Sequence, residues 1–482
     1  MSTVNFRTSA LNTTTTTNGD LAFKSSNSTL VDFLYKVPVA ENATDVELLT
    51  LRLMEDVNYS DSIKLKAILY LRDIREGMGI RDNFRIALRT VANFYYLSPD
   101  RISTFIEYIP VVGRWDDLVC DEEGHVSCLL QDHNTSTKVT KLIKAGMSNE
   151  NTFALCAKWM PRKGVVAKLL AKRLFPFSKT PHKDYRKTIA KLSNTLEQKM
   201  SANRWEDIEF SKLPSLALSK HKRAFVRNCP NSWAAFNTKV SSGEAKVNAG
   251  AIYPHQIWSA FNKDANQVIA NSQWNSIPIK DFKSKILVMA DTSGSMWHST
   301  KYGYAIDICV SLSVFLAEKL PWPFKDLVLN FSANPEFVDL SAQTSSMDKI
   351  KALHHAAWAM NTDFRKAYQR ILEIAKANSL PQAEMPEYLL VFSDMQFDVS
   401  GTGKFPVASI RESFESFGYR MPKLIFWNLV DSDTMPAENE DGVLLLSGFS
   451  IKLLEQILAS SGDFTPESAI LNLLKDKYED LD

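Results

Sequence analysis

The first half of the chain repeats apolar residues at the spacing of an α-helix. In the segment DNFRIALRTVANFYYL, the residues Phe84, Leu88, Val91 and Tyr95 form one stripe on a helix with about 3.6 residues per turn. The segment before it carries a similar stripe, and the periodicity is helical from residue 43 to about 110. This pattern predicts a series of short antiparallel helices.

Turn and capping residues mark where these helices begin and end. Gly77 and Gly79 suit a helix stop followed by a tight turn, and Ser98 followed by Pro99 suits a helix start. Such helices bury their stripes by stacking on neighbours, as in a solenoid of helical repeats; an irregular helical domain is the alternative, because no exact repeat is visible. The sequence also predicts irregular or weakly helical structure at 229–250 and further helices at about 165–175, 183–200 and 252–270.

Near Pro278 the pattern changes to short apolar runs with polar ends. The runs are KILVMAD, DLVLNFS, YLLVFSD and KLIFWNLV, and helical segments separate several of them. This alternation predicts an α/β doubly wound domain, in which helices cover both faces of a mostly parallel sheet. Residues 1–28 are rich in Thr, Ser and Asn, so we expect a flexible arm there, either mostly disordered or loosely docked. A helical-repeat domain is expected at 29–278 and the α/β domain at 279–482.

Composition narrows the class of protein. The 482 residues are 45% hydrophobic, which suits a globular protein of two or three domains. The five cysteines are scattered and form no C-x-x-C pair, so neither a disulfide framework nor a zinc site is indicated. No segment has the pattern of a signal peptide or a membrane span. We expect a cytoplasmic protein without a membrane partner.

Acidic and hydroxyl residues lie at the ends of two predicted strands. Asp291 ends one strand and Asp394 ends another, and the carboxyl ends of parallel strands share one edge of a sheet. Ser293 and Ser295 follow Asp291 at alternate positions, so all three can face one side of a loop, and Gly294 permits an unusual backbone angle there. Carboxylate and hydroxyl oxygens suit Mg²⁺ or a similar divalent cation.

Other interpretations of this segment are possible. A nucleophilic serine would need Gly-x-Ser-x-Gly, and a phosphate loop would need Gly-Lys-Ser or Gly-Lys-Thr; the sequence TSGSM supplies neither. A phosphatase with Asp291 as its nucleophile is a further alternative, but the loop after Asp291 supplies no obvious lysine partner or second acid. Asp291 as a simple helix cap is the structural alternative. We therefore expect no catalytic residue.

Positive charge is concentrated in one segment, although the whole chain carries a net charge of only +1. Residues 158–228 hold 18 Lys and Arg against 5 Asp and Glu, a net +13, which leaves −12 elsewhere. Lysine rows one helical turn apart can follow a phosphate backbone, whereas a single row usually means a solvated helix face. Four clusters favour nucleic-acid binding, by Arg162, Lys163, Lys168, Lys172, Arg173, Lys183, Arg186, Lys187, Lys191, Lys220, Lys222, Arg223 and Arg227.

The acidic loops resemble those of von Willebrand factor A domains. DTSGSM matches their Asp-x-Ser-x-Ser motif, AAWAMNTDF resembles the loop that supplies a threonine, and VFSDMQFD resembles the final acidic loop. The resemblance implies a metal-ion-dependent adhesion site, with Thr362 joining Asp291, Ser293, Ser295 and Asp394 as ligands. Sites of this kind also take a carboxylate from a protein partner.

A helical-repeat domain followed by such a domain resembles the Ro ribonucleoprotein autoantigen (TROVE) family. The resemblance covers roughly residues 30 to 460 and includes YLRDIREGMG, VVGRWDDL and IYPHQIWSA. It implies a HEAT-like ring, no enzymatic activity, and binding of structured or single-stranded RNA. A metal-dependent interaction scaffold without RNA is the alternative, followed by a metal-dependent hydrolase.

Overall fold

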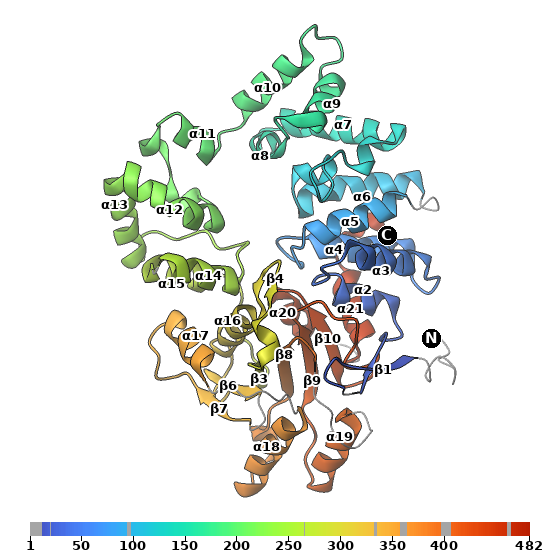
Figure 1. The fold of residues 1–482 in the computed structure, drawn as a ribbon, viewed down its shortest axis with the longest axis vertical. Coiled ribbons are helices and arrows are strands. Elements are labelled where there is room, and N and C mark those ends of the chain that lie inside the picture. The colour runs from blue at the N-terminus through green and yellow to red at the C-terminus, as the bar shows by residue number, and fades with distance from the viewer. Residues whose placement is uncertain are drawn as a thin grey trace. The chain divides into compact units, whose positions relative to one another are not determined.

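The computed structural model describes residues 12–19, 21–93, 98–264, 266–331, 335–356, 364–396, 406–459 and 464–482. The chain divides into two compact units (Figure 1). We call Met1–Asn42 with Ala249–Leu473 the sheet unit, and Ala43–Asn248 with Leu474–Asp482 the helical unit. This division differs from the predicted limits at 28 and 278, because the helix at 29–36 and the helices at 254–264 and 267–275 pack with elements of the sheet unit.

The helical unit is built from short helices that pack on their neighbours along the chain. The predicted start at Ser98 is confirmed, since its Oγ accepts a 3.3 Å hydrogen bond from the N–H of Arg101. The helices are α3 (Ala43–Glu55), α4 (Asp61–Arg72), α5 (Asp82–Ala92), α6 (Pro99–Val112), α7 (His133–Ser148), α8 (Phe153–Trp159), α9 (Gly164–Leu174), α10 (Pro181–Leu192), α11 (Leu196–Ser201), α12 (Ser215–Asn228) and α13 (Pro230–Ser241).

Two expectations for this unit are wrong. The helix predicted at 183–200 is interrupted between α10 and α11, because Thr195 forms a capping box with Gln198 and starts a new helix. The segment 229–250 is irregular after Ser241, as expected, but the expectation of irregular or weakly helical structure is wrong for 230–241, because α13 is a regular helix. Its buried residues Trp233, Phe236 and Val240 form a helical stripe.

The sheet unit holds a six-stranded sheet within the described residues, in the order β10-β9-β8-β3-β6-β7. All neighbouring strands are parallel except β6 and β7. The strands are β3 (Ile286–Asp291), β6 (Leu327–Phe331), β7 (Phe337–Asp339), β8 (Tyr388–Ser393), β9 (Lys423–Asn428) and β10 (Val443–Ser447). The four predicted runs are therefore confirmed as β3, β6, β8 and β9.

Helices cover the sheet, and β3 and β10 are buried along their whole length, as expected where both faces are covered. The apolar helix α16 (Ala305–Ala317) packs against β3, β6 and β8. The other helices of this unit are α2 (Thr29–Lys36), α14 (Pro254–Asp264), α15 (Gln267–Asn275), α17 (Ser346–His355), α18 (Phe364–Ala377), α19 (Pro406–Ser416) and α20 (Lys452–Ala459), while α21 (Pro466–Lys475) ends in the helical unit. The fold is thus a helical domain and an α/β domain.

The described part of the predicted flexible arm is folded and docked. Strands β1 (Thr13–Thr15) and β2 (Leu21–Phe23) form a hairpin. Phe23 and Met435 exchange two backbone hydrogen bonds of 2.9 and 2.7 Å, which ties the hairpin to the sheet unit. Backbone pairing and the burial of Ala22 and Phe23 together hold the segment, which is otherwise rich in polar side chains. In the part of the chain that is described, no helix has the length and apolarity needed to cross a bilayer.

Candidate metal centre and nucleic-acid interface

The predicted metal centre lies beside β3, where the order in which strands are added to the sheet reverses. From β3 the chain continues to β6 on one side and later to β8 on the other, and Ala290 of β3 pairs with Phe392 of β8. Ligands of open α/β sheets bind at such switch points, beyond the carboxyl ends of the strands. Asp291 ends β3 and Asp394 follows β8 directly, so the structure brings these two predicted ligands to one edge.

The loop after Asp291 folds back onto that carboxylate. The N–H of Ser293 donates a 2.9 Å hydrogen bond to Oδ1 of Asp291, and the Oγ atoms of Ser293 and Ser295 lie 2.9 Å apart. Gly294 does not need its conformational freedom, contrary to expectation. Its φ lies outside the left-handed region, and a Cβ there would meet no described atom within 4 Å.

Both carboxylates are buried, with Asp291 at 0% and Asp394 at 3% exposure. Burial raises the pKa of Asp291, and the nearby charge of Asp394 raises it further, although hydrogen bonds from Ser393 and Ser293 oppose the change. Within the described residues, no Lys, Arg or His forms an ion pair with Asp291 or Asp394. A bound cation would relieve this repulsion.

The donor set fits a divalent cation that prefers oxygen. Asp291, Ser293, Ser295 and Asp394 would supply carboxylate and hydroxyl oxygens, as Mg²⁺ requires. Among the described residues, no cluster of three or more His, Cys, Asp or Glu side chains offers a different kind of metal site. Thr362, the remaining predicted ligand, lies outside the described residues.

Ser393 belongs to this site although the sequence did not point to it. Its Oγ donates a 2.5 Å hydrogen bond to Oδ2 of Asp291, and it also accepts from the N–H of Met395. The sequence did contain a signal for this residue, because Ser393 directly precedes Asp394 at the end of a predicted strand. Recognising it required knowing that this strand pairs with the one that ends in Asp291.

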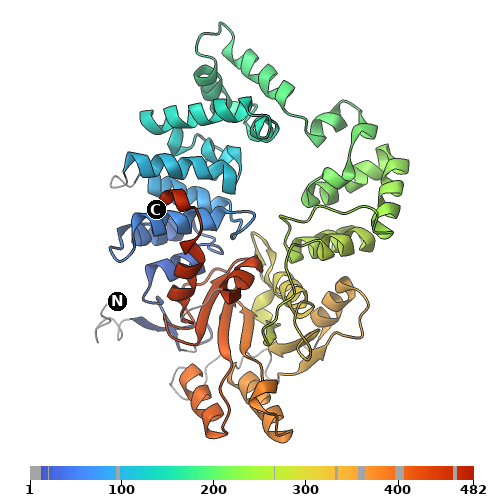
Figure 2. The ribbon, with the colours of Figure 1, turned by 180° about the vertical axis from the view of Figure 1, so that it is seen from behind.

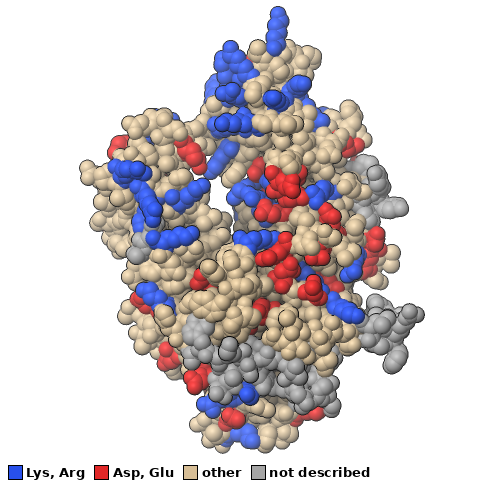
Figure 3. Space-filling view, in the orientation of Figure 1, with Lys and Arg blue, Asp and Glu red and all other residues tan. Residues whose placement is uncertain are grey.

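The predicted nucleic-acid interface lies in the helical unit. Helices α9 and α10 lie side by side in both views of the ribbon (Figure 1 and Figure 2). Lys and Arg gather at the top of Figure 3, where Figure 1 places these two helices. In α10, Tyr185 and Ile189 are buried as predicted, which leaves the lysine row facing solvent. The interrupted helix places Leu196 on α11 instead.

Most of the predicted RNA-binding side chains are exposed, and only Arg173 and Lys222 are half-buried. Two of the arginines have partners within the protein. Arg162 donates to Oγ of Ser193, and Arg173 donates to the carbonyl of Leu130, each at 2.8 Å. In the described structure, nine of the other predicted cations form no ion pair: Lys163, Lys168, Lys172, Lys183, Arg186, Lys187, Lys191, Lys220 and Arg227.

Two tryptophans near the basic segment have structural surroundings. Trp115 is buried as a packing residue, and Gly146 lies against its indole ring. The ring of Trp159 is half-buried, with the guanidinium of Arg114 at 4.1 Å and Nζ of Lys158 at 5.2 Å from its centroid. Trp159 therefore already makes cation–π contacts within the protein.

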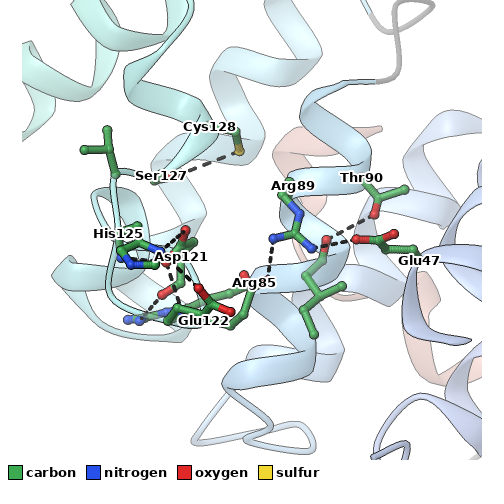
Figure 4. Close-up of polar contacts among 12 residues, drawn as sticks. Glu47, Arg85, Arg89, Thr90, Asp121, Glu122, His125, Ser127 and Cys128 are labelled. Atoms are coloured by element: carbon green, nitrogen blue, oxygen red, sulfur yellow. Dashed lines mark hydrogen bonds and ion pairs between the residues drawn. The ribbon is translucent and has the colours of Figure 1, made fainter. Parts of the chain in front are cut away.

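A small pocket of about 100 Å³, which the sequence did not indicate, lies beside α5. Arg85 and Arg89 line it together with Cys120. Arg85 is paired with Asp117, and Arg89 is paired with Glu47, as Figure 4 shows for the second pair. Arg89 contacts Glu47 at 2.6 Å and also Glu122. Burial raises the pKa of the Cys120 thiol to about 11 and also raises the pKa of the Cys128 thiol, which disfavours the thiolate form of both cysteines.

Comparisons with known proteins match most of the chain. Two family models match, both described as domains of unknown function: DUF2828 over residues 177–285 and DUF7788 over residues 285–480. The chain is 29% identical to "Uncharacterized protein L728" of Acanthamoeba polyphaga mimivirus, over 95% of this chain and 87% of that protein.

A solved structure also aligns with the chain. The crystal structure of the Deinococcus radiodurans Ro (RSR) protein covers 95% of this chain and 100% of that one, at 14% identity and a TM-score of 0.41.

Proposed function

We propose that this protein is a non-enzymatic RNA-binding protein that holds RNA on the basic helices α9, α10 and α12. The observation that carries the proposal is the row of exposed lysines on α9 and α10 that form no ion pair within the described residues. Unpaired cations at helical spacing attract phosphates without first having to break an internal contact. Structured RNA and single-stranded ends are both candidate ligands.

We also propose that the sheet unit binds a magnesium ion. Asp291, Ser293, Ser295 and Asp394, with Thr362, would hold it, and an open coordination position would accept a carboxylate from an acidic protein partner. When bound, the ion supplies positive charge between two buried carboxylates. The second candidate is a protein-interaction scaffold that depends on the metal and does not bind RNA. The observation that favours it is the burial of Asp291 and Asp394. The five free cysteines suit a cytoplasmic location.

RNA binding can be tested by fluorescence anisotropy with the full chain. We expect binding to single-stranded and hairpin RNA that weakens steeply with salt. The double variant Lys183→Glu, Lys187→Glu should bind at least about tenfold more weakly, because it reverses two charges in one row. The matched control Arg52→Glu, Lys325→Glu changes the same charge at exposed positions outside the interface. Absence of RNA binding at low salt would contradict the proposal.

A further inference from the structure

Phe177 is the most exposed aromatic side chain of the helical unit, at 100% exposure. It lies in the loop between α9 and α10. Phenylalanine is among the residues most often found inside proteins, so a side chain left wholly in solvent calls for a physical reason. Among the described residues of the helical unit, no other Phe, Trp or Tyr is mostly exposed.

The loop that carries Phe177 is held on both sides. The N–H of Phe175 donates to the carbonyl of Ala171 at 3.0 Å, and the N–H of Ser178 donates to the carbonyl of Phe175 at 3.2 Å. Oγ of Ser178 then donates a 2.5 Å hydrogen bond to Asp184 on α10. Pro176 restricts the backbone directly before Phe177. The backbone is therefore fixed while the aromatic ring faces solvent.

Cations flank Phe177 along the chain. Lys172 lies in the last turn of α9 before the loop, and Lys179 and Lys183 follow Phe177. The one acid of α10, Asp184, is already engaged by the Ser178 hydroxyl. An aromatic ring between cations suits a nucleic acid strand, because the ring can stack on a base while the cations hold the flanking phosphates.

A membrane surface fits this arrangement less well. An interfacial membrane site needs a continuous apolar face that enters the lipid. On α9 the mostly exposed hydrophobic residue is Val165, at the end of the helix opposite to Phe177. Exposed lysines, including Lys168 and Lys172, lie between them.

We infer that Phe177 stacks on an unpaired base, so that this loop makes the protein prefer single-stranded over duplex RNA. The inference rests on the proposed RNA binding and names the part of the ligand that it recognises. In a duplex, each base is already stacked and its face is closed to a side chain. Phe177 therefore contributes to single-strand binding only.

The test is fluorescence anisotropy of the full chain with an unstructured single strand of A and C, and with a perfectly paired RNA of equal length. We expect Phe177→Ala to weaken single-strand binding about five- to a hundredfold, as for loss of one base–aromatic stack, and to leave duplex binding unchanged. Phe177→Trp should retain single-strand binding, since it keeps an aromatic face. Val57→Ala, at a position that is 94% exposed in the same unit, is the control.

The outcomes separate the two proposals. If the unaltered protein binds RNA but Phe177→Ala loses nothing, or loses single-strand and duplex binding equally, the inference about Phe177 is wrong and the proposed function stands. If the unaltered protein binds neither RNA, the proposed function fails and the inference fails with it. Binding to vesicles of anionic lipid that depends on Phe177, without an effect on RNA, would assign the ring to a membrane instead.

Discussion

Oγ of Ser393 donates a 2.5 Å hydrogen bond to Oδ2 of Asp291, across the pair of strands β8 and β3. This bond favours the ionised form of a buried carboxylate. We predict that Ser393→Ala weakens Mg²⁺ binding about tenfold or more near neutral pH, because residues that orient a metal ligand usually have effects of this size. Isothermal titration with Mg²⁺ measures it. Ser341→Ala, outside the site, serves as the control, and equal affinities for both variants would contradict the assignment.

Removal of the metal should lower the stability of the protein. We expect chelator to lower the unfolding temperature, since a ligand present at about a hundred times its Kd contributes about 2.7 kcal/mol. Asp394→Asn should abolish the response to Mg²⁺ and raise the stability of the metal-free protein, because it removes one of two repelling charges. Differential scanning fluorimetry with Mg²⁺ and with chelator provides the measurement. Asp339→Asn, an exposed acid of the same unit, should respond like the unaltered protein.

His255 should make the protein sensitive to acid. Burial lowers its pKa from 6.5 to about 4, and the charge of Asp307 only partly opposes this. The neutral form is therefore favoured in the folded state, and its contribution to stability is complete above pH 6.5 and is lost as the pH falls through about 4.

In acid, the free energy of unfolding should fall by at most about 3 kcal/mol through His255. His255→Phe keeps the ring contacts to Tyr253 and Phe449 and should flatten the dependence of the free energy of unfolding on pH over this range. Urea unfolding at several pH values measures the slope. The exposed His125, changed to Phe, should leave the slope unaltered. An unchanged slope in His255→Phe would exclude this residue as its source.

Asp117 should be the most sensitive acid of the helical unit. Its carboxylate is fully buried and accepts hydrogen bonds from Arg72, Arg85 and the N–H of Arg114, at 2.8 to 2.9 Å. Asp117→Ala leaves two buried guanidiniums without their main partner and should cost about 3–5 kcal/mol in chemical denaturation. Asp116→Ala, which removes only the 3.1 Å contact to Arg85, should cost clearly less. Similar losses would refute this ranking.

Gly146 should tolerate no side chain. A Cβ at this position would lie 2.2 Å from the Cη2 atom of Trp115. We predict that Gly146→Ala lowers the free energy of unfolding by about 1–3 kcal/mol through overpacking. Trp115→Phe shortens the opposing ring, so the double variant should lose less than the sum of the single changes. Additive losses would show that the clash is relieved elsewhere.

Much of the fold follows from local periodicity. The stripes through α5 and α10 and the apolar runs of β3 and β8 were predictable, because the spacing of apolar residues reports directly which face of an element is buried. The strand β10 was missed, although it is a buried run of five residues, because short apolar runs do not distinguish a strand from a buried helical turn. The helix α13 was missed because its polar residues mask a narrow stripe.

The candidate site residues likewise include some that the sequence predicted and some that it did not. Asp291, Ser293 and Ser295 could be named from one short motif, because their spacing along the chain alone brings them to one loop. Ser393 could not, since its role depends on pairing with a strand 102 residues away. Phe177 could not either, because an aromatic residue beside helices is ordinarily expected in the core.

By itself, the sequence determined the two fold classes, the positions of most elements, the acidic motif and the basic segment, because these depend on residues close together in the chain. Only the tertiary structure decided that β3 and β8 are neighbours, that their ends bury two carboxylates together, and that the ring of Phe177 lies in solvent. Neighbours in a sheet and exposure to solvent are set by how distant segments pack, which no local pattern encodes.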